Sequence, residues 1–438
     1  MFFGDKMYLY VKNILLAIAT SFLLLGSIFF TIKLKCVQFQ FKNIFKSLFA
    51  KTNSEISPIK TLLLSMGARI GVGSIAGVAL SIYLGGVGTI FWLCVTTLLS
   101  ISLSFCETVL GNLYKKRDKN GMYQGGPSYY LKYGAGYKKL ALLYAVVLII
   151  SYIGGFISIQ ANTITTSALS FYNVNKYYIA IIISIITIFI IFGGLKKILN
   201  VTSKIVPFMA LLYIGSSLFI IILNITKLPS ILLFIIKSAF TFKSFIYGFL
   251  PMFIIGLQRG VFSSESGLGT GSVASSITTE NDSVKQGYIQ MSGIYISLFI
   301  CITTAIVFLL SDYNLNYLQN VNGIELVQYA FRYHIGRFGD IVVFVSIFLF
   351  SYSTIITGYY YGESGIKFIT QKNIEQKVFF LKIFTIIIVL LGCLVNANIV
   401  WDFVDILVCV LAAINVFALF ILRKDIFNEL QCYKSKKI

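Results

Sequence analysis

The 438-residue chain has few charged residues and few of the side chains on which most enzyme chemistry depends. Charged residues make up 12% of it and hydrophobic residues 57%, which leaves too little polar surface for a water-soluble fold of this size. It contains one histidine, His334, and its seven cysteines show no CxxC or CxxxC spacing. Those spacings would indicate metal ligands or a redox pair. We therefore expect neither an enzyme nor a bound cofactor.

The chain carries instead a series of apolar runs, each of about 17 to 25 residues and so long enough to cross a bilayer. They predict an all-α polytopic membrane protein with about 11 transmembrane helices. The runs lie near residues 13–32, 61–83, 87–112, 141–169, 177–195, 204–225, 243–272, 288–311, 341–366, 378–396 and 401–422.

Acidic residues are also scarce, since 16 Asp and Glu stand against 36 Lys and Arg, for a formal net charge of +20. Of the basic residues, 25 fall on one side of the predicted spans and 8 on the other, with three inside spans. The positive-inside rule then places the N-terminus outside and the C-terminus in the cytoplasm, in a multi-pass protein of the plasma (inner) membrane. The basic excess is thus topological, the lipid bilayer is the expected partner, and no nucleic acid is expected.

Three features outside the spans complete this topology. Segment 36–51 is predicted to form an amphipathic helix on the inner leaflet, because its phenylalanines face one way and its lysines the other. Segment 115–139, rich in Gly, Tyr and Lys, is predicted to be cytoplasmic. His334 is expected at the surface of an external loop, residues 312–340.

The second run has features that a continuous membrane helix tolerates poorly. Arg69 lies within it, together with four glycines at positions 67, 71, 73 and 77. A helix in lipid must satisfy every backbone amide itself, so a break is tolerated only where it lines a cavity in the protein. Transporters bind their substrates at broken spans of this kind. The pattern therefore predicts a transporter with its binding site at this break.

A short internal repeat supports that interpretation. The sequence GVGSIA at residues 71–76 returns as GTGSVA at residues 269–274, five spans later. Copies separated by an odd number of spans enter the membrane in opposite senses, as in inverted five-helix repeats. Chance is the alternative, since Gly, Ser and Ala recur easily in membrane helices. The repeat predicts four parts: an extra N-terminal helix with the amphipathic segment (1–56), a first repeat (57–226), a second repeat (227–424) and a cytoplasmic tail (425–438).

Ionisable residues inside spans need a partner or water, because an unpaired charge there costs about 2.5 to 3.5 kcal/mol. Two interpretations stay open for them: they line a substrate pathway, or those near span ends cap helices and reach the interface. The second applies above all to Glu107 and to the two aspartates. The residues concerned are Arg69, Glu107, Arg259, Glu265, Asp402 and Asp405.

Span 341–366 carries three hydroxyl groups on neighbouring faces of one apolar helix, from Ser351, Ser353 and Thr354. Hard cations bind such oxygens, together with carbonyls of a nearby unwound helix. The alternative is that each hydroxyl bonds back to its own helix.

The chain resembles the alanine or glycine:cation symporter family in five stretches, which occur in order: GARIGVGSIAGVALSIYLGGVGTIFW, FCETVLGNLYKKRDKNGMYQGGPSYYL, QRGVFSSESGLGTGSVA, FSYSTIITGYYYGE and VWDFVDIL. The resemblance implies the leucine-transporter-like fold of the amino acid/polyamine/organocation group. That fold here has one extra N-terminal helix and two inverted five-helix repeats, in agreement with the count of spans.

The resemblance also implies a substrate site at the broken second span. The unwound backbone around Val72, Gly73 and Ser74 would hold the amino and carboxylate groups of an amino acid. Gln160 matches a glutamine of the family's fourth span. A tryptophan of the family falls on Gly358, which implies a larger pocket and room for a side chain larger than alanine's.

A sodium site is implied beside it. Ser353 and Thr354 match its hydroxyl ligands, joined by carbonyls near Gly67 and Ile70. Arg69 stands where the family has threonine. A guanidinium can neutralise a substrate carboxylate without a mobile ion, so Arg69 is a possible substitute for the cation.

These patterns predict secondary active uptake of a small neutral amino acid, alanine- or glycine-like, coupled to a monovalent cation by alternating access. Sodium is the expected co-substrate. Two alternatives stay open: a cation-independent or proton-coupled amino acid transporter in which Arg69 replaces the ion, and an amino acid sensor that does not transport. A channel is disfavoured, since the sequence shows no filter motif.

Overall fold

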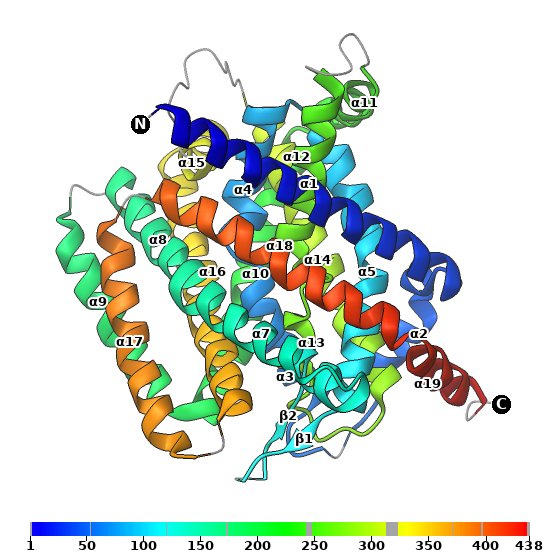
Figure 1. Cartoon of the computed structure of the whole chain (residues 1–438). Helices are drawn as coiled ribbons and strands as arrows, with labels where there is room; N and C mark the ends of the chain where they lie inside the picture. The colour runs from blue at the N-terminus through cyan, green and yellow to red at the C-terminus, as the bar shows by residue number, and fades with distance from the viewer. Residues whose placement is uncertain are drawn as a thin grey trace.

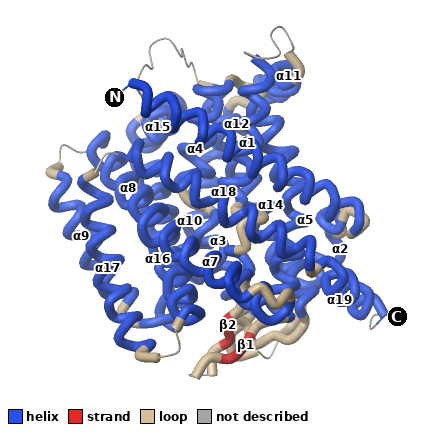
Figure 2. Tube along the Cα trace, in the orientation of Figure 1, coloured by secondary structure: helices blue, strands red, loops and turns tan. Residues whose placement is uncertain are grey.

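The computed structural model describes residues 2–52, 54–119, 121–171, 174–241, 248–311, 323–370, 372–395 and 397–435. Helices make up nearly all of this part of the chain, apart from loops and a small hairpin at one end of the molecule (Figures 1 and 2). Nine helical segments in the described residues are long and apolar enough to cross a membrane. They are Leu15–Lys33, Pro58–Gly85, Thr89–Leu113, Lys138–Ser170, Gly194–Leu223, Ser283–Leu310, Arg337–Ile369, Ile374–Leu394 and Phe403–Ile421. The all-α polytopic class is confirmed, and the number of eleven spans stays a prediction.

Two further apolar segments fall on predicted spans. Helix α9, Lys176–Ile191, is apolar but shorter than the nine. The predicted span 243–272 folds as two helices, α12 (Leu250–Ser264) and α13 (Thr270–Ser275), with a break between them. Residues 242–247 lie outside the described residues.

The predicted break in the second span is present. Helix α3, Pro58–Arg69, ends before Ile70, whose ψ of 76° is not helical, and α4, Val72–Gly85, begins after an extended Gly71. Gly71 is the N-cap of α4, as Gly269 is the N-cap of α13. The two copies of the repeated sequence therefore begin their second half-helices at the same position, although Gly71 is extended and Gly269 is left-handed.

The broken helices lie inside a shell of longer ones. Helices α5 and α14 pack against each other and on α3, α4, α12 and α13. Helices α10 and α16 cover α3, while α8, α9, α16 and α17 form one group, and α1 crosses the front of Figure 1 beside α18. The bounds of the shell helices are α1 Phe2–Lys33, α5 Thr89–Leu113, α10 Gly194–Leu223, α14 Ser283–Leu310, α16 Arg337–Ile369, α17 Ile374–Leu394 and α18 Ala397–Ile421.

The fourth span and the segment before it are irregular. The span consists of α7 (Lys138–Ile149), a π-helix η3 (Ile150–Phe156) and α8 (Ile157–Phe171). The predicted cytoplasmic segment 115–139 forms the elements at the lower end of Figure 1. They are an antiparallel hairpin of β1 (Lys116–Arg117) and β2 (Tyr123–Gln124), followed by α6 (Pro127–Tyr129) and the π-turn η2 (Tyr130–Gly134).

The predicted spans 177–195 and 204–225 leave residues 196–203 between them as a connection, but these residues belong to α10, Gly194–Leu223, so the predicted start of the later span was wrong. Lys196 and Lys197 are exposed, whereas Ile198 and Leu199 are buried. The helix extends beyond the apolar run because lysine is a good helix former and its charge stays in contact with solvent.

The predicted external loop 312–340 contains a helix, α15 (Gly323–Ile335), while residues 312–322 lie outside the described residues. His334 is at its end and is half-buried, with Nε2 3.3 Å from the carbonyl oxygen of Val307. Three further helices flank the spans: α2 (Phe41–Leu48), α11 (Leu228–Ala239) and α19 (Arg423–Ser435).

The amphipathic helix predicted within residues 36–51 forms as α2. Its phenylalanines are exposed, and Phe45 keeps 57% of its surface accessible. The hydroxyl of Tyr288 on α14 donates to Gln40 Oε1 at 2.7 Å and so ties the start of α2 to the helix bundle. Its position on the inner leaflet stays a prediction.

Candidate substrate and ion site at two helix breaks

Helix α16 places hydroxyl groups beside the first break. Ser353 Oγ lies 3.0 Å, and Thr354 Oγ1 2.9 Å, from the carbonyl oxygen of Gly67 near the end of α3. Both hydroxyls are also within 3.0 Å of the carbonyl oxygen of Phe350 in their own helix. The hydroxyls therefore bond back to their own helix and also across to α3, and their binding of a cation stays a prediction. Oxygens from two helices gather at one point, and this is the chemistry that binds a hard cation.

The other residues predicted near this point behave differently. Ser351 Oγ is buried and has no hydrogen-bond partner among the described residues. The amide of Ile70 donates to the carbonyl of Met66 at 2.8 Å, so it completes the last turn of α3. A cation contact of the Ile70 carbonyl stays a prediction.

Gln160, on α8, reaches the backbone of the first break. A β-carbon on Gly71 would lie 2.9 Å from Thr354 Oγ1 and 3.2 Å from Gln160 Nε2, so glycine is what lets α8 and α16 approach the break together. Gln160 is 4% exposed, and its Oε1 has no hydrogen-bond partner among the described residues. An unpaired buried acceptor costs about 1 to 3 kcal/mol. A donor on a ligand would remove that cost.

The three predicted substrate residues Val72, Gly73 and Ser74 form the first turn of α4. Val72 is buried. Ser74 Oγ lies 3.2 Å from the hydroxyl of Ser297 on α14, so it has a partner within the protein. A β-carbon on Gly73 would be 3.9 Å from the ring of Phe262, which is ordinary contact. Of the three, Gly73 thus faces α12 across the break.

Gly358 does not leave an open space. A β-carbon there would lie 3.4 Å from both Ile157 and Tyr152, which pack over the position from α8 and η3. Tyr152 in turn stacks on Phe156, with ring centroids 4.7 Å apart. The larger pocket expected at Gly358 is therefore filled by neighbouring side chains at this position.

The second break, residues 265–269, is held by its own backbone geometry and by Glu265. Glu265 ends α12 with φ of 49°, and Gly267 and Gly269 have φ of 84° and 87°, a region that favours glycine. The hydroxyls of Tyr152 and Thr270 donate to the two carboxylate oxygens of Glu265 at 2.8 and 3.1 Å. The carboxylate therefore joins the fourth span to both halves of the broken one.

Glu107, on α5, holds the same break from the other side. Its Oε2 accepts from the amide of Gly269 at 2.9 Å and from Asn415 Nδ2 at 3.0 Å. Asn415 Nδ2 also lies 2.8 Å from the carbonyl of Gly267, and the hydroxyl of Tyr130 donates to Asn415 Oδ1. Glu107 is fully buried. The alternative that Glu107 reaches the interface is therefore wrong, whereas its bond to the amide of Gly269, the N-cap residue of α13, agrees with the alternative that it caps a helix end.

The side chain of Arg69 extends from the first break toward the second. It is 2% exposed, with Nη1 3.2 Å from the carbonyl of Gln290 and Nη2 3.1 Å from Ser104 Oγ. Its charge interacts with the carboxylates of Glu107 and Glu265. The guanidinium thus lies among α5, α13 and α14, whereas the hydroxyls of α16 are beside Gly67.

An aromatic layer covers the side of the site formed by α12. The ring of Phe262 lies 5.7 Å from that of Phe156 and 5.9 Å from that of Trp401. The guanidinium of Arg259 is 5.9 Å from the Trp401 ring, and Asp405 acts on its charge. Arg259 and Asp405, two of the predicted intramembrane charges, are therefore neighbours here. The side chain of Asp402 lies outside the described residues.

Two broken apolar helices held inside a shell of long membrane helices define a multi-pass membrane transporter, not an enzyme. The chain belongs to the sodium:alanine symporter family, whose sequence profile matches residues 2–438.

Individual relatives agree with this membership. The chain is 35% identical to the amino-acid carrier protein AlsT of Bacillus subtilis (strain 168) over 422 residues, covering 95% of this chain and 89% of that protein. It is 34% identical to the probable sodium/glutamine symporter GlnT of the same organism over 433 residues, covering 97% and 89%. Among solved structures it is similar to MhsT in complex with L-phenylalanine, with TM-score 0.59 and 14% identity over 85% of this chain and 90% of that one. The likeness shows the leucine-transporter-like fold.

Proposed function

We propose that this chain carries a small neutral amino acid across the membrane together with a monovalent cation, with sodium as the expected ion. Membership of the sodium:alanine symporter family supports it. The observation that carries the proposal is the meeting of the Ser353 and Thr354 hydroxyls at the carbonyl of Gly67, directly before a helix break. In this proposal these oxygens bind the cation.

The amino acid is proposed to bind at the same break. The amide groups of Val72 and Gly73 at the start of α4 lie at the positive end of a helix dipole and suit a carboxylate, whereas the amide of Ser74 already donates to the carbonyl of Gly71 at 3.2 Å. The unpaired Gln160 Oε1 suits an ammonium group, which is a strong donor. The packing of Ile157 and Tyr152 over Gly358 favours a small side chain on the substrate.

The structure gives less support to Arg69 as a replacement for the cation. Its hydrogen bonds go to Ser104 and Gln290, and the carboxylates near it belong to the protein. In the proposed mechanism Arg69 joins the two broken helices, and a mobile cation completes the site on α16. Coupling then requires that the cation bind one conformation better than the other. The proposal keeps the predicted sidedness, with the N-terminus outside and the C-terminus in the cytoplasm of the plasma membrane.

Uptake by purified protein in proteoliposomes tests the proposal. We expect labelled alanine or glycine to accumulate when sodium is outside, and not with choline. Replacing Thr354 by Ala removes one oxygen from the proposed cation site, and we expect the sodium concentration for half-maximal uptake to rise at least about tenfold, or about 1.4 kcal/mol. Thr385→Ala is the matched control, because it removes the same hydroxyl from α17, where Thr385 Oγ1 donates to the carbonyl of Leu381 in its own helix at 2.8 Å.

Three results would count against this mechanism. Equal uptake in sodium, potassium and choline would remove cation coupling. Equal sodium dependence of uptake by Thr354→Ala and by the wild type would show that the cation does not bind at Thr354. Saturable amino acid binding without any uptake would favour the sensor.

A further inference from the structure

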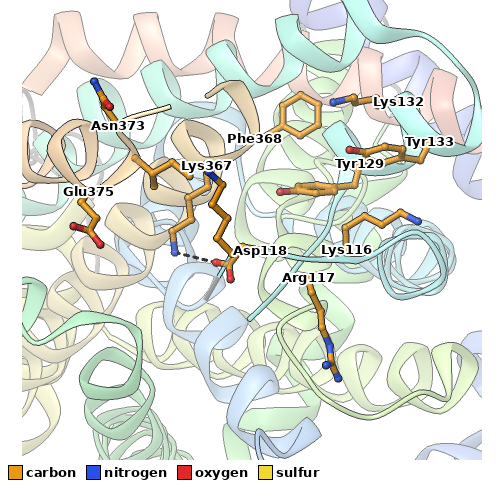
Figure 3. Close-up of a pocket in the computed structure, with 12 residues that line it drawn as sticks. Lys116, Arg117, Asp118, Tyr129, Lys132, Tyr133, Lys367, Phe368, Asn373 and Glu375 are labelled. Atoms are coloured by element: carbon orange, nitrogen blue, oxygen red, sulfur yellow. Dashed lines mark ion pairs between the residues drawn. The ribbon is translucent and has the colours of Figure 1, made fainter. Parts of the chain in front are cut away.

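A cavity of about 410 Å³ opens at the end of the molecule that carries the β-hairpin (Figure 3). This is within the range of about 300 to 1,000 Å³ that is usual for small-molecule sites. One wall is formed by the hairpin and the α6–η2 turn, and the other by the end of α16 and the start of α17. All of its lining residues lie outside the two helix breaks, so the cavity is separate from the proposed transport site.

The cavity has an excess of positive charge. Five basic and two acidic residues line it, which is a formal excess of three positive charges. The five basic side chains therefore lie around a single cavity. A cavity lined by one sign of charge concentrates ligands of the opposite sign. The charged lining residues are Lys116, Arg117, Lys119, Lys132 and Lys367, with Asp118 and Glu375.

Two of these residues have a structural role in the cavity wall. Lys367 Nζ lies 2.9 Å from Glu363 Oε1, one turn before it on α16, and 3.8 Å from Asp118 Oδ2 in the hairpin. Asp118 Oδ1 accepts from the amide of Met122 at 2.9 Å and closes the hairpin turn. Asp118 and Lys367 therefore attach the hairpin to α16, and their charges are largely matched within the protein.

Lys116 and Lys132 are placed differently. Their Nζ atoms lie 5.3 and 5.1 Å from the centre of the Tyr133 ring, and Lys132 Nζ is 5.3 Å from that of Phe368. In the described part of the chain neither lysine forms an ion pair. Two ammonium groups held at one aromatic ring repel each other, and the ring offsets only part of that repulsion. In Figure 3 both lie beside Tyr133, while Arg117 extends away from it.

We propose that this cavity binds a phosphate-bearing anion, with Lys116 and Lys132 as its cationic partners. Phosphate fits because it carries up to two negative charges and several acceptor oxygens in a compact group, and lysine is a common partner for it. The hydroxyl of Tyr129, which also lines the cavity, is a further donor. Bound phosphate would join the hairpin, through Lys116, to η2, through Lys132, directly before the fourth span. On the predicted topology the cavity opens to the cytoplasm, where the phosphate can belong to an anionic lipid headgroup or to a soluble metabolite.

Thermal unfolding of the purified full-length protein distinguishes these sources, because a ligand that binds the native state raises its melting temperature by mass action. The first set of samples is in neutral detergent and receives pyrophosphate or ADP, with sodium chloride adjusted to keep ionic strength constant. The second receives dioleoylphosphatidylglycerol or, for comparison, dioleoylphosphatidylcholine at the same mole fraction. We expect at least one phosphate probe to raise the melting temperature by several degrees over its comparison.

The variants assign that stabilisation to the cavity. The double variant Lys116→Gln, Lys132→Gln should lower the affinity for the effective probe at least about tenfold. The double variant Lys116→Arg, Lys132→Arg keeps both charges and should retain most of the affinity, which would show that the fold tolerates substitution at these positions. Lys42→Gln with Lys46→Gln removes the same charge from α2 and is the control for non-specific attraction. A response to the soluble probes alone supports a metabolite, and a response to phosphatidylglycerol alone supports a lipid.

The proposal is overturned if no probe stabilises the wild type. It is also overturned if the two glutamine pairs weaken binding equally, since attraction would then be a property of the whole basic surface. Amino acid uptake is not part of this readout, so the cavity can fail while the proposed transport function stands, and the reverse.

Discussion

The side chain of Arg69 occupies the space in which Gly271 would otherwise carry a β-carbon, because that position overlaps Arg69 Nη2. Arg69 ends the first half of one broken helix, and Gly271 lies in the second half of the other. The two breaks are therefore joined by a single buried side chain, whose charge acts on the carboxyl groups of Glu107 and Glu265. A movement of either broken helix must carry the other with it or break this contact.

Replacing Gly271 by Ala should show how much depends on the contact. The methyl group would force Arg69 away from α13, and we expect a loss of stability of about 1 to 3 kcal/mol, the usual cost of overpacking a core. The melting temperature in detergent should fall, and uptake should fall with it. Gly215→Ala is the control, because nothing lies within 4 Å of its β-carbon position. An unchanged melting temperature for Gly271→Ala would contradict the close packing.

The first break could be predicted from sequence because its signal is local. Glycines at short spacing weaken a membrane helix wherever it lies, so Gly71 and Gly73 indicated the position of the break to within a residue or two. The hydroxyls of Ser353 and Thr354 were predicted from resemblance to the family, and they lie where that resemblance puts them relative to Gly67.

The second break was not predicted, although Gly267 and Gly269 stood in the sequence. Its supports come from helices that are distant in sequence: Tyr130 and Asn415, for example, are 285 positions apart. Such contacts depend on how whole helices pack, which a single sequence does not specify. Besides these two glycines, Asn415 was a local signal, as a lone amide in the apolar run 401–422, since a polar group there needs a partner.

Glu107 should be essential for the second break. Glu107→Leu leaves the amide of Gly269 without an acceptor and removes one of the two acceptors of Asn415 Nδ2, which keeps the carbonyl of Gly267. Each buried donor left unpaired costs about 1 to 3 kcal/mol. We expect a large fall in melting temperature, and a smaller one for Glu107→Gln, which keeps one acceptor oxygen.

The control for Glu107 is Glu55→Leu, an exposed carboxylate outside the spans. If Glu107→Leu has the same melting temperature as the wild type, the second break is held by its backbone geometry alone.

Substitutions at Gly358 test whether neighbouring side chains already fill the space beside it. Gly358→Ala should be tolerated, because its β-carbon would meet Ile157 and Tyr152 at ordinary contact distance. Gly358→Trp should destabilise the protein by several degrees, since an indole has to displace both side chains. Gly215→Trp, at a position with no neighbour within 4 Å, controls for the bulk of tryptophan. A Gly358→Trp protein of wild-type stability would indicate an open pocket at this position, as the sequence suggested.

Lys115, which follows α5, should make stability depend on pH. Its Nζ donates to the carbonyls of Thr278 and Glu280 at 2.8 and 2.6 Å, and burial lowers the pKa of Lys115 to about 8, while the charge of Glu280 opposes the shift. Because the unfolded chain keeps this proton up to about pH 10.4, it binds more protons than the folded protein between pH 8 and that value. The contribution of Lys115 to stability therefore rises with pH across this window.

Melting temperatures of wild type and Lys115→Met, measured from pH 7 to pH 10, isolate that contribution, because the other titrating groups are common to both. We expect the wild type to gain stability relative to the variant as the pH passes 8. Lys119→Met, an exposed lysine in the same segment, should follow the wild type. Parallel curves for wild type and Lys115→Met would show that the ammonium of Lys115 keeps its ordinary pKa and that its two carbonyl contacts compensate for burial.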